Sequence, residues 1–521
     1  MAEPRPSVAL PQGRVIGIQL KNDFPQPIDA FLGIPYAQPP VGDLRFRPAL
    51  KVPHAPSTTI DASKYGPIAP GKALIQTGPQ LKQSEDCLTA NVFRPSSPNG
   101  TVDREHEANK ALPVAIYIHG GAFNRGSAAS HNTSSMVAWF AQPFIAVSFG
   151  YRLGALGFLP STVTKNEGAL NLGLRDQVLL MEWVQENIPF FCSKCCYARW
   201  PIGHHLLNYS ETNPSKPRFH RVIIESGAPT FRAVRPYNAA IHEAQFRDFL
   251  KQLGASKLSE IDIFPFLRAL PTETITSAQT AVFDKYNPSL RWAFQPVIDN
   301  LNDLIPRAHL ESWTKGLCHI VPILTGFTTN EGTMYVANID SPSAFQAFWT
   351  NLLPALSTHG LGSQYKRLEA AYAHYACVAP VRQTAHFASS QNPGGIWLYH
   401  WALPRTVVGR ANHGDNMFYE TYDAEITGIS PTQRELSGVL HAYLTSFIVA
   451  GDPNAVRGWY GDRPVWGVYK AERPGVLGFG EGIGELVGGG NEGAVAMFVD
   501  DAWAREQTRF WWGRVGVSQV G

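Results

Sequence analysis

The chain has 521 residues, a formal net charge of +2 at pH 7, and an apolar fraction of 44% that includes 28 Phe, 18 Tyr and 13 Trp. Apolar side chains in this number supply a large core and exclude a disordered chain. The small net charge gives no electrostatic reason to expect nucleic acid or an acidic membrane surface as a partner. No linker or internal repeat divides the sequence, so we expect a single domain over residues 1–521.

The N-terminus and the cysteines bear on the compartment. Residues 1–18 contain no long apolar run behind a basic start, and no stretch is long enough to span a bilayer. Six Cys in 521 residues do not make a disulfide scaffold. We therefore expect a cytoplasmic protein that is not held in a membrane.

The first half of the chain predicts strands followed by a long helix. Residues 13–20 and 28–37 alternate apolar and polar side chains around KNDFPQP, which predicts a β-hairpin at a sheet edge. Residues 112–123 indicate a buried strand followed by a glycine loop, and residues 144–159 contain the next buried strand. The stretch from 168 to 188 has helical apolar spacing and ends before a proline, so we expect a helix packed on the sheet.

The second half continues with strands and inserted helices. Residues 221–227 and the start of 322–335 indicate buried strands, while 238–253 and 261–270 indicate helices. The Gly-rich stretch 478–493 is typical of a surface loop, and it is not a phosphate cradle because no G-K-[ST] follows.

Two long motifs, FLGIPYAQPPVGDLRFRP (Phe31 to Pro48) and SEDCLTANVFRP (Ser84 to Pro95), closely resemble signatures of the carboxylesterase type-B (cholinesterase/lipase) family. The resemblance extends through most of the chain, to GDPN (Gly451 to Asn454) and the late Trp466. It implies an α/β-hydrolase fold, with a central, mostly parallel sheet, helices on both faces and helical insertions over the active site. It also implies a carboxylic ester hydrolase that forms an acyl-enzyme and uses no cofactor and no metal.

The same resemblance assigns the catalytic positions. The segment NEG places Glu331 at the family's triad acid, and ANHGDNMFY places His413 at the triad base. In that mechanism the histidine removes the nucleophile's proton, and the carboxylate fixes the tautomer and stabilises the imidazolium. In HGGAF, the N–H groups of Gly121 and Ala122 are the implied oxyanion-hole donors.

Three further positions have supporting roles by resemblance. Arg45 and Glu85 match a structural ion pair, and Ser226 matches a serine that supports the catalytic groups from behind. Cys87 matches the family's first disulfide, but its partner position holds Ala69, which agrees with a reducing compartment.

The segment that should carry the nucleophile departs from the family. Members have a strand, a sharp G-x-S-x-G turn and a helix here, and the turn needs small residues beside the serine. Between Ile188 and Gly203 this chain has only PFFCSKCCYARWPI, which contains no such motif and is about eight residues too short for that geometry. The predicted domain is therefore disrupted at about residues 189–202.

Three interpretations of this segment stay open. The first is a gene-model or splicing error, and the second is a pseudoenzyme that keeps the fold for binding or as a scaffold. The third is a thiol nucleophile, because an ungapped count back from Gly203 places Cys196 at the serine position, and a thiolate is a strong nucleophile beside a base. Against it, Lys194 and Ala198 replace the glycines on either side, and Tyr197 follows directly.

The cysteines of this segment also raise the question of a metal. Cys192 and Cys195 form a C-x-x-C, and His204 and His205 follow it closely. Adjacent histidines point apart on a helix, and no second ligand pair has zinc spacing, so we predict no metal site there.

If the chain folds as written, a strand stub should replace the missing elbow. An empty central slot would leave buried amides of the neighbouring strands unpaired, so we expect Cys195 to Ala198 to pair there. Pro201 would open the next helix after a plain turn around Arg199 and Trp200. We expect reduced stability and no ester hydrolysis above background.

The sequence shows no cluster of basic residues, and this bears on the expected substrate. No basic cluster marks an anionic acyl group, which favours a small or medium uncharged ester or lactone as the small-molecule partner. The oligomeric state stays open.

Overall fold

The structure, a computed structural model, describes residues 5–21, 23–73, 78–96, 112–192, 195–197, 203–208, 217–230, 234–299, 303–336, 341, 343–344, 347, 364–405 and 411–514. The chain divides into two compact units. The first comprises Met1–Ala198, Pro236–Tyr286 and Trp292–Asp299, and the second comprises Arg199–Arg235, Asn287–Arg291 and Asn300–Gly521. A single domain over 1–521 stays a prediction.

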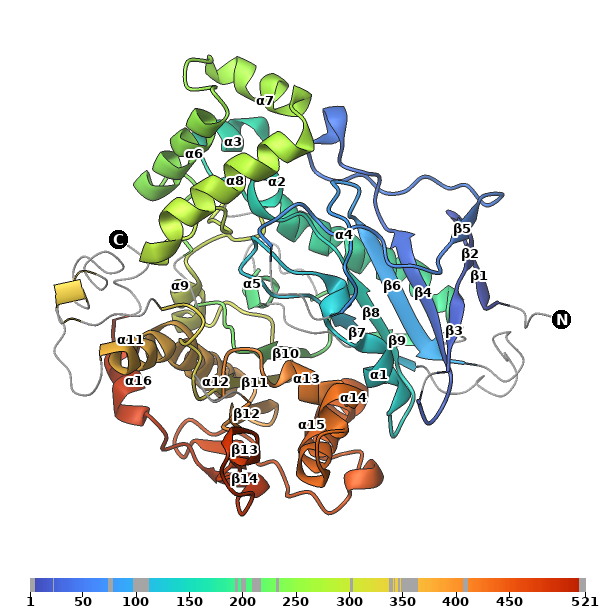
Figure 1. Cartoon of the computed structure of the whole chain (residues 1–521), viewed down its shortest axis with the longest axis vertical. Coiled ribbons are helices and arrows are strands. Elements are labelled where there is room, and N and C mark those ends of the chain that lie inside the picture. Colours follow the sequence, from blue (N-terminus) through green and yellow to red (C-terminus); the bar gives the residue numbers. More distant parts are fainter. Residues whose placement is uncertain are drawn as a thin grey trace. The chain divides into compact units, whose positions relative to one another are not determined.

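The first unit contains a six-stranded sheet in the order β3-β4-β6-β8-β7-β9, drawn from blue to teal in Figure 1. Pairs from β3 to β8 are antiparallel, whereas β8, β7 and β9 run parallel. The strands are β3 (Ile18–Leu20), β4 (Ile28–Pro35), β6 (Thr89–Pro95), β7 (Leu112–Tyr117), β8 (Ile145–Phe149) and β9 (Cys195–Tyr197). The predicted hairpin is confirmed for β3 and β4, which pair at the sheet edge, whereas residues 13–16 form β2 in another sheet.

Within the described residues, the first unit also contains a second sheet and seven α-helices. The three-stranded sheet contains β1 (Ser7–Leu10), β2 (Gly13–Ile16) and β5 (Thr59–Asp61). The helices are α1 (Thr133–Ala138), α2 (Gly154–Gly157), α3 (Thr162–Glu167), α4 (Leu172–Asn187), α6 (Ala240–Gln252), α7 (Glu260–Ala269) and α8 (Thr272–Tyr286). The helices predicted at 168–188, 238–253 and 261–270 are confirmed as α4, α6 and α7. Every residue of β8 is buried, as expected for a strand covered on both faces.

The stub strand predicted at Cys195 to Ala198 is present as β9 over Cys195–Tyr197, but it lies at the edge of its sheet, so the predicted central position is not confirmed. It pairs with β7 in parallel register, with Leu112 opposite Cys195 and Val114 opposite Tyr197, and it is the last strand of its sheet. The predicted helix start at Pro201 and the turn around Arg199 and Trp200 lie outside the described residues. The next described helix, α5, covers Gly203–Leu206.

The second unit contains a five-stranded sheet in the order β10-β11-β12-β13-β14. The first four strands are parallel and β14 is antiparallel. The strands are β10 (Val222–Glu225), β11 (Ile323–Thr328), β12 (Ile396–Trp401), β13 (Gly475–Glu481) and β14 (Ala494–Asp500). Its helices include α5, α9 (His309–Thr314), α11 (Gln364–Ala373), α12 (Ala379–Gln391), α13 (Met417–Glu420), α14 (Ala424–Thr427), α15 (Pro431–Ala450) and α16 (Arg505–Trp512).

Long helices of the second unit pack on its sheet. Helix α12 contacts β11 and β12, and Phe447 of α15 meets Trp397 of β12 with ring centroids 5.7 Å apart. The ends of α15 follow from the sequence: the Ser430 side chain accepts the N–H of Gln433, and Gly451 ends the helix with a φ of 78°. Within the described residues, no helix is both long and apolar enough to cross a lipid bilayer.

The prediction of a surface loop over 478–493 is partly wrong. Gly478 to Glu481 belong to β13, whose residues are buried up to Phe479 and Gly480. Gly480 has a φ of +68°, and a Cβ there would lie 2.6 Å from Cβ of Leu403. A glycine lets the strand approach Leu403 closely, so packing overrides the loop tendency of a Gly-rich segment.

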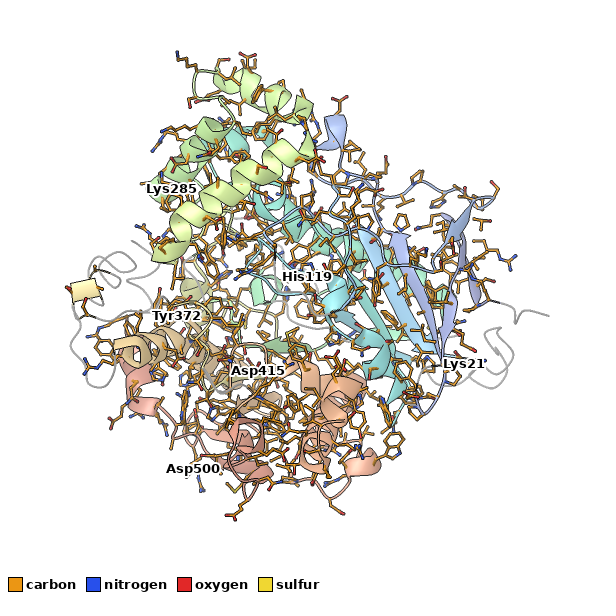
Figure 2. All side chains as sticks on the ribbon, in the orientation of Figure 1. Lys21, His119, Lys285, Tyr372, Asp415 and Asp500 are labelled. Atoms are coloured by element: carbon orange, nitrogen blue, oxygen red, sulfur yellow. The ribbon has the colours of Figure 1, made fainter. Side chains whose placement is uncertain are left out.

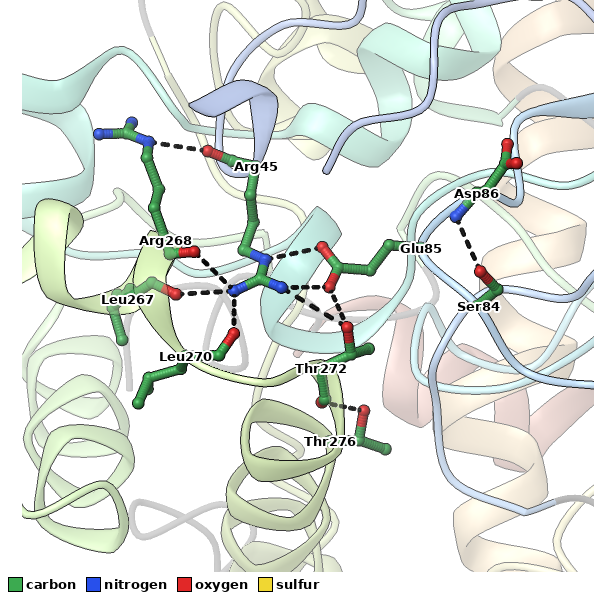
Figure 3. A network of polar contacts seen from close by, with 9 residues as sticks. All are labelled: Arg45, Ser84, Glu85, Asp86, Leu267, Arg268, Leu270, Thr272 and Thr276. Atoms are coloured by element: carbon green, nitrogen blue, oxygen red, sulfur yellow. Dashed lines mark hydrogen bonds and ion pairs between the residues drawn. The ribbon is translucent and has the colours of Figure 1, made fainter. Parts of the chain in front are cut away.

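The predicted ion pair of Arg45 and Glu85 fixes helix ends in the first unit (Figure 3). Nε and Nη2 of Arg45 donate to the two carboxylate oxygens of Glu85, at 2.8 and 2.6 Å. Nη1 donates to the carbonyls of Leu267 and Leu270 at the C-terminal end of α7, at 3.0 and 2.5 Å. Thr272, which begins α8, donates to Glu85 at 2.5 Å. One buried guanidinium therefore satisfies the last carbonyls of α7 and the carboxylate together.

We predict that Glu85→Gln lowers the free energy of unfolding by about 3–5 kcal/mol, because it leaves the Arg45 charge buried and unbalanced. Urea unfolding followed by Trp fluorescence measures the change. The matched control is Glu186→Gln, which breaks an exposed pair with Lys51 and should cost less than about 1 kcal/mol. Equal shifts for the two variants would contradict a special role for the buried pair.

Candidate active site

Two loops of the second unit are held in register beyond the strand ends. After β11, the N–H of Asn330 donates to the carbonyl of Ala411 at 2.8 Å, and Asn330 forms a parallel bridge with Asn412. The residues that follow this bridge are Glu331 and His413. The backbone pairing therefore brings together two side chains that are 82 positions apart.

Glu331 and His413 form a short hydrogen bond. Nδ1 of His413 lies 2.5 Å from Oε2 of Glu331, and the other carboxylate oxygen accepts the N–H of Thr328 at 2.7 Å. The Glu331 side chain is fully buried, while that of His413 is 27% exposed. With Nδ1–H donating to the carboxylate, the lone pair of Nε2 is left to accept a proton.

A tight turn carries the histidine. The N–H of Asn412 donates to Oδ2 of Asp415 at 2.8 Å, and the N–H of Asp415 returns to the carbonyl of Asn412 at 3.1 Å. Gly414 takes the left-handed φ of +81° that this turn needs. Burial raises the pKa of the Asp415 carboxyl, labelled in Figure 2, to about 6.

Two carboxyl groups, those of the partly buried Glu225 and the buried Glu420, lie close to the segment that follows this turn. Glu225, at the end of β10, accepts hydrogen bonds at one oxygen from Tyr399 and Asn416, both at 2.9 Å. Glu420, at the end of α13, also hydrogen-bonds Glu225, and burial raises the pKa of Glu420 to about 8. At neutral pH Glu420 therefore keeps its proton, and the bond from Asn416 to Glu225 anchors the segment that follows His413.

The glycine loop of the first unit presents two backbone donors. The N–H groups of Gly121 and Ala122 donate to no group in the part of the chain that the structure describes. The opposite ends of both peptides are held: the Gly120 carbonyl by Nδ1 of His119 at 2.9 Å, and the Gly121 carbonyl by the N–H of Asn124 at 3.2 Å. Both donors are thus fixed in direction, as oxyanion stabilisation requires.

The backbone of this loop is unusual. Gly121, Ala122 and Phe123 have φ values of 112°, 54° and 62°, and the last two are left-handed without being glycine. Such residues cost about 1–3 kcal/mol each and persist where the surroundings fix them. Here the Ala122 carbonyl accepts the side-chain amides of Asn124 and Gln295, at 2.9 and 3.0 Å.

His119, labelled in Figure 2, is held as a neutral donor. Its ring stacks on Tyr151 with centroids 4.5 Å apart, and burial lowers its pKa to about 4. A Cβ on Gly126 would lie 2.5 Å from Nδ1 of His119, so this glycine leaves room for the ring. Gly121 is equally constrained, because its Cβ would lie 2.1 Å from the Arg125 carbonyl.

The structure describes the predicted position Ser226 fully, but it describes only the backbone of Cys196. Ser226 lies directly after β10 with a φ of +49°, and its buried hydroxyl has no hydrogen-bond partner among the described residues. Its N–H donates to the Gly326 carbonyl at 2.9 Å. Cys196 lies in β9, but its side chain is outside the described part of the chain, and so is the surrounding elbow region.

Sequence reasoning missed five polar groups that contact or lie near the predicted positions: His119, Asn124 and Gln295 in the first unit, and Glu420 and Cys377 in the second. The histidine of HGGAF could have been found, because it precedes the glycine pair directly. The others stand in segments without a motif, and only the fold brings each of them to its contacts within its own unit.

We predict that Glu420 makes the chain less stable as the pH rises from about 5 to 8. The folded chain keeps a proton up to a pKa of about 8, whereas the unfolded chain loses it near the ordinary value of 4.5. The folded state therefore binds more protons in this window, and the free energy of unfolding falls with increasing pH. Glu420→Gln, which is neutral throughout, should flatten the dependence of the melting temperature on pH.

The matched control for that experiment is Glu425→Gln, because Glu425 is exposed on the next helix. It should keep the pH dependence of the unaltered chain. A Glu420→Gln variant with the same slope as the unaltered chain would disprove the protonated carboxyl.

Comparison with known proteins identifies the family. The carboxylesterase family profile matches residues 4–356. Secreted lipase 4 of Gibberella zeae is 32% identical over 488 residues, covering 87% of this chain and 84% of that protein. Para-nitrobenzyl esterase of Bacillus subtilis is 29% identical over 413 residues, covering 76% and 79%.

The fold is shared with solved esterase structures. EstA of Aspergillus niger superimposes with a TM-score of 0.81 at 24% identity, covering 100% of both chains. The predicted α/β-hydrolase fold is thereby confirmed. The chain belongs to the carboxylesterase family and is, by family, a carboxylic ester hydrolase.

Proposed function

We propose that the scaffold serves acyl-enzyme hydrolysis of small or medium uncharged esters or lactones, with His413 as the general base. The observation that carries this proposal is the 2.5 Å contact between Nδ1 of His413 and the buried Glu331 carboxylate. A base held in this way takes a proton at Nε2 from the nucleophile and returns it to the leaving alcohol. The carboxylate stabilises the imidazolium that forms between these steps.

The N–H groups of Gly121 and Ala122 are proposed to bind the oxyanion. Two observations support this role. Both peptides are fixed at their carbonyl ends, and neither N–H donates to another group within the described residues. Each such donor contributes about 3–4 kcal/mol to transition-state stabilisation in related chemistry. His119 is then a positioning residue, because it acts through the Gly120 carbonyl.

The nucleophile is the part that this chain lacks. No G-x-S-x-G occurs anywhere in the 521 residues, and Ser226 is flanked at the two glycine positions by Ile224 and Ala228. We propose that the chain as written has no activated serine. Cys196 is the alternative nucleophile, and a binding or scaffold role without catalysis is the alternative function.

The names of the relatives and the state of the cysteines bear on the proposed substrate and the proposed compartment. The relatives include proteins named lipase and esterase, which supports an ester substrate for this chain. A cytoplasmic location stays a prediction. Cys87 and Cys318 are buried and not disulfide-bonded, which supports a reducing compartment, whereas a disulfide at Cys192 and the name of the secreted relative support export.

We predict that the purified, reduced chain gives no label with a fluorophosphonate probe and hydrolyses p-nitrophenyl acetate at the background rate. The reason is that a base without a nucleophile leaves only the residual contribution of binding and the oxyanion hole. The measurement compares the unaltered chain with Cys196→Ala, Cys195→Ala and His413→Gln, and it uses an active serine esterase as the positive control for the probe.

Labelling by the fluorophosphonate would show an activated serine and would overturn the proposal. Hydrolysis without labelling that disappears in Cys196→Ala and His413→Gln, but persists in Cys195→Ala, would instead establish the thiol nucleophile. Background rates in all samples, with a cooperative melting transition, support an esterase scaffold without its nucleophile.

A further inference from the structure

A cysteine of the second unit lies beside the proposed base and its carboxylate. One ligand atom each from Glu331, Cys377 and His413 lies within 4.8 Å of the other two. Glu331 and Cys377 are fully buried, and His413 is partly exposed. The three side chains thus form one cluster that opens to solvent on the histidine side.

The fold brings Cys377 to this place through a π-helical turn. Residues His374–Val378 form this turn between α11 and α12, and Cys377 lies within it. π-Turns inside helices occur frequently at functional sites because they change the direction of the side chains they carry. The helix also lies close to the acid loop, since a Cβ on Gly332 would be 2.3 Å from the carbonyl of Glu369.

Side-chain contacts fix the acid loop against this helix. The N–H of Gly332 donates to Oε1 of Glu369 at 3.2 Å, and Asn330 donates to its other oxygen at 3.4 Å. Next to Glu331, the hydroxyl of Thr328 is buried without a hydrogen-bond partner among the described residues. The position of the cluster is therefore set by backbone and side-chain bonds on both sides of Glu331.

We propose that Glu331, Cys377 and His413 form a binding site for a zinc-type divalent cation. Carboxylate, thiolate and imidazole are the three ligand types that zinc takes from proteins, and three protein ligands leave a fourth position for water. Calcium and magnesium prefer sites made only of oxygen ligands, so the thiol and the imidazole select against them.

The charge of the buried cluster favours such an ion. The zinc-bound form of this cluster would contain the carboxylate, the thiolate and a neutral imidazole. On binding, the Cys377 thiol releases one proton, so two negative ligands and one neutral ligand balance a dication. A neutral assembly is the form that a buried site tolerates best.

The bound cation would switch off the base. Nδ1 is the ring nitrogen that faces Glu331. The metal would replace this hydrogen bond, and Nδ1 and Oε2 would move apart from 2.5 Å to the separation of about 3.3 Å that two tetrahedral zinc ligands have. The imidazole proton would then lie on Nε2, and this nitrogen could no longer accept a proton from a nucleophile. The inhibitory consequence rests on the proposed role of His413, whereas the binding itself does not.

Zinc binding by the full chain tests the proposal. The protein is kept reduced, stripped with a chelator, and titrated with zinc chloride by equilibrium dialysis. We expect Cys377→Ser to bind one equivalent less than the unaltered chain. The matched control is Cys318→Ser, which alters another buried cysteine of the same unit and should bind as much zinc as the unaltered chain.

Cobalt substitution gives a second, spectroscopic readout. Cobalt at this site should show a thiolate-to-metal charge-transfer band that is absent from Cys377→Ser and reduced in intensity in His413→Gln. Equal zinc binding by the unaltered chain and Cys377→Ser, or no zinc bound by either, would overturn the proposal.

X-ray absorption of the unaltered zinc protein keeps the test decisive if Cys377→Ser does not fold. The proposal requires a first coordination shell with one sulfur and the rest nitrogen and oxygen. A shell without sulfur, or one with several sulfurs as the cysteines near residue 195 would supply, contradicts it.

Discussion

The hydrogen bond between His413 and Glu331 depends on a backbone constraint in the second unit. The bridge between Asn330 and Asn412 holds two loops in register directly before these residues. The N–H of Thr328 donates to the Glu331 carboxylate and fixes it. The turn closed by Asp415 fixes the backbone that carries His413. Glu331 and His413 are therefore held by backbone and side-chain contacts within the second unit, and these described contacts do not include residues 189–202.

The glycine loop of the first unit, Gly120 to Phe123, follows the same physical rule. Backbone donors are useful only if they are already aimed, because reorganisation during the reaction removes the electrostatic gain. His119 and Asn124 hold the carbonyl ends of the two peptides, and left-handed φ values at Ala122 and Phe123 persist because side-chain amides fix the loop. The Arg45–Glu85 pair similarly fixes helix ends by satisfying carbonyls that burial would otherwise leave unpaired.

Sequence patterns predicted the parts of the molecule whose signal is local or carried by a long motif. Buried strands such as β7 and β8 follow from apolar runs, and Glu331 and His413 follow from their place in a family resemblance. The stub strand β9 followed from the need to pair buried amides, although only its backbone is described.

The groups that sequence patterns did not predict depend on tertiary contacts. Cys377 reaches the acid and base only because a π-turn carries it there and Gly332 permits a close approach. The raised pKa of Glu420 depends on burial beside Glu225, which no local pattern encodes. Gly478 to Glu481 resembled a loop by composition, but packing against Leu403 made them part of a strand.

We propose that this scaffold is an esterase that lacks only its serine nucleophile. The most direct test replaces residues 189–202 with a designed strand, a G-x-S-x-G turn and a helix start, about eight residues longer than the present segment. We expect the replacement variant to be labelled by the fluorophosphonate probe and to hydrolyse p-nitrophenyl esters. Adding His413→Gln to this variant should lower its kcat by at least about 10³-fold. A cooperatively folded replacement variant that stays at the background rate, or that is unaffected by His413→Gln, would contradict it.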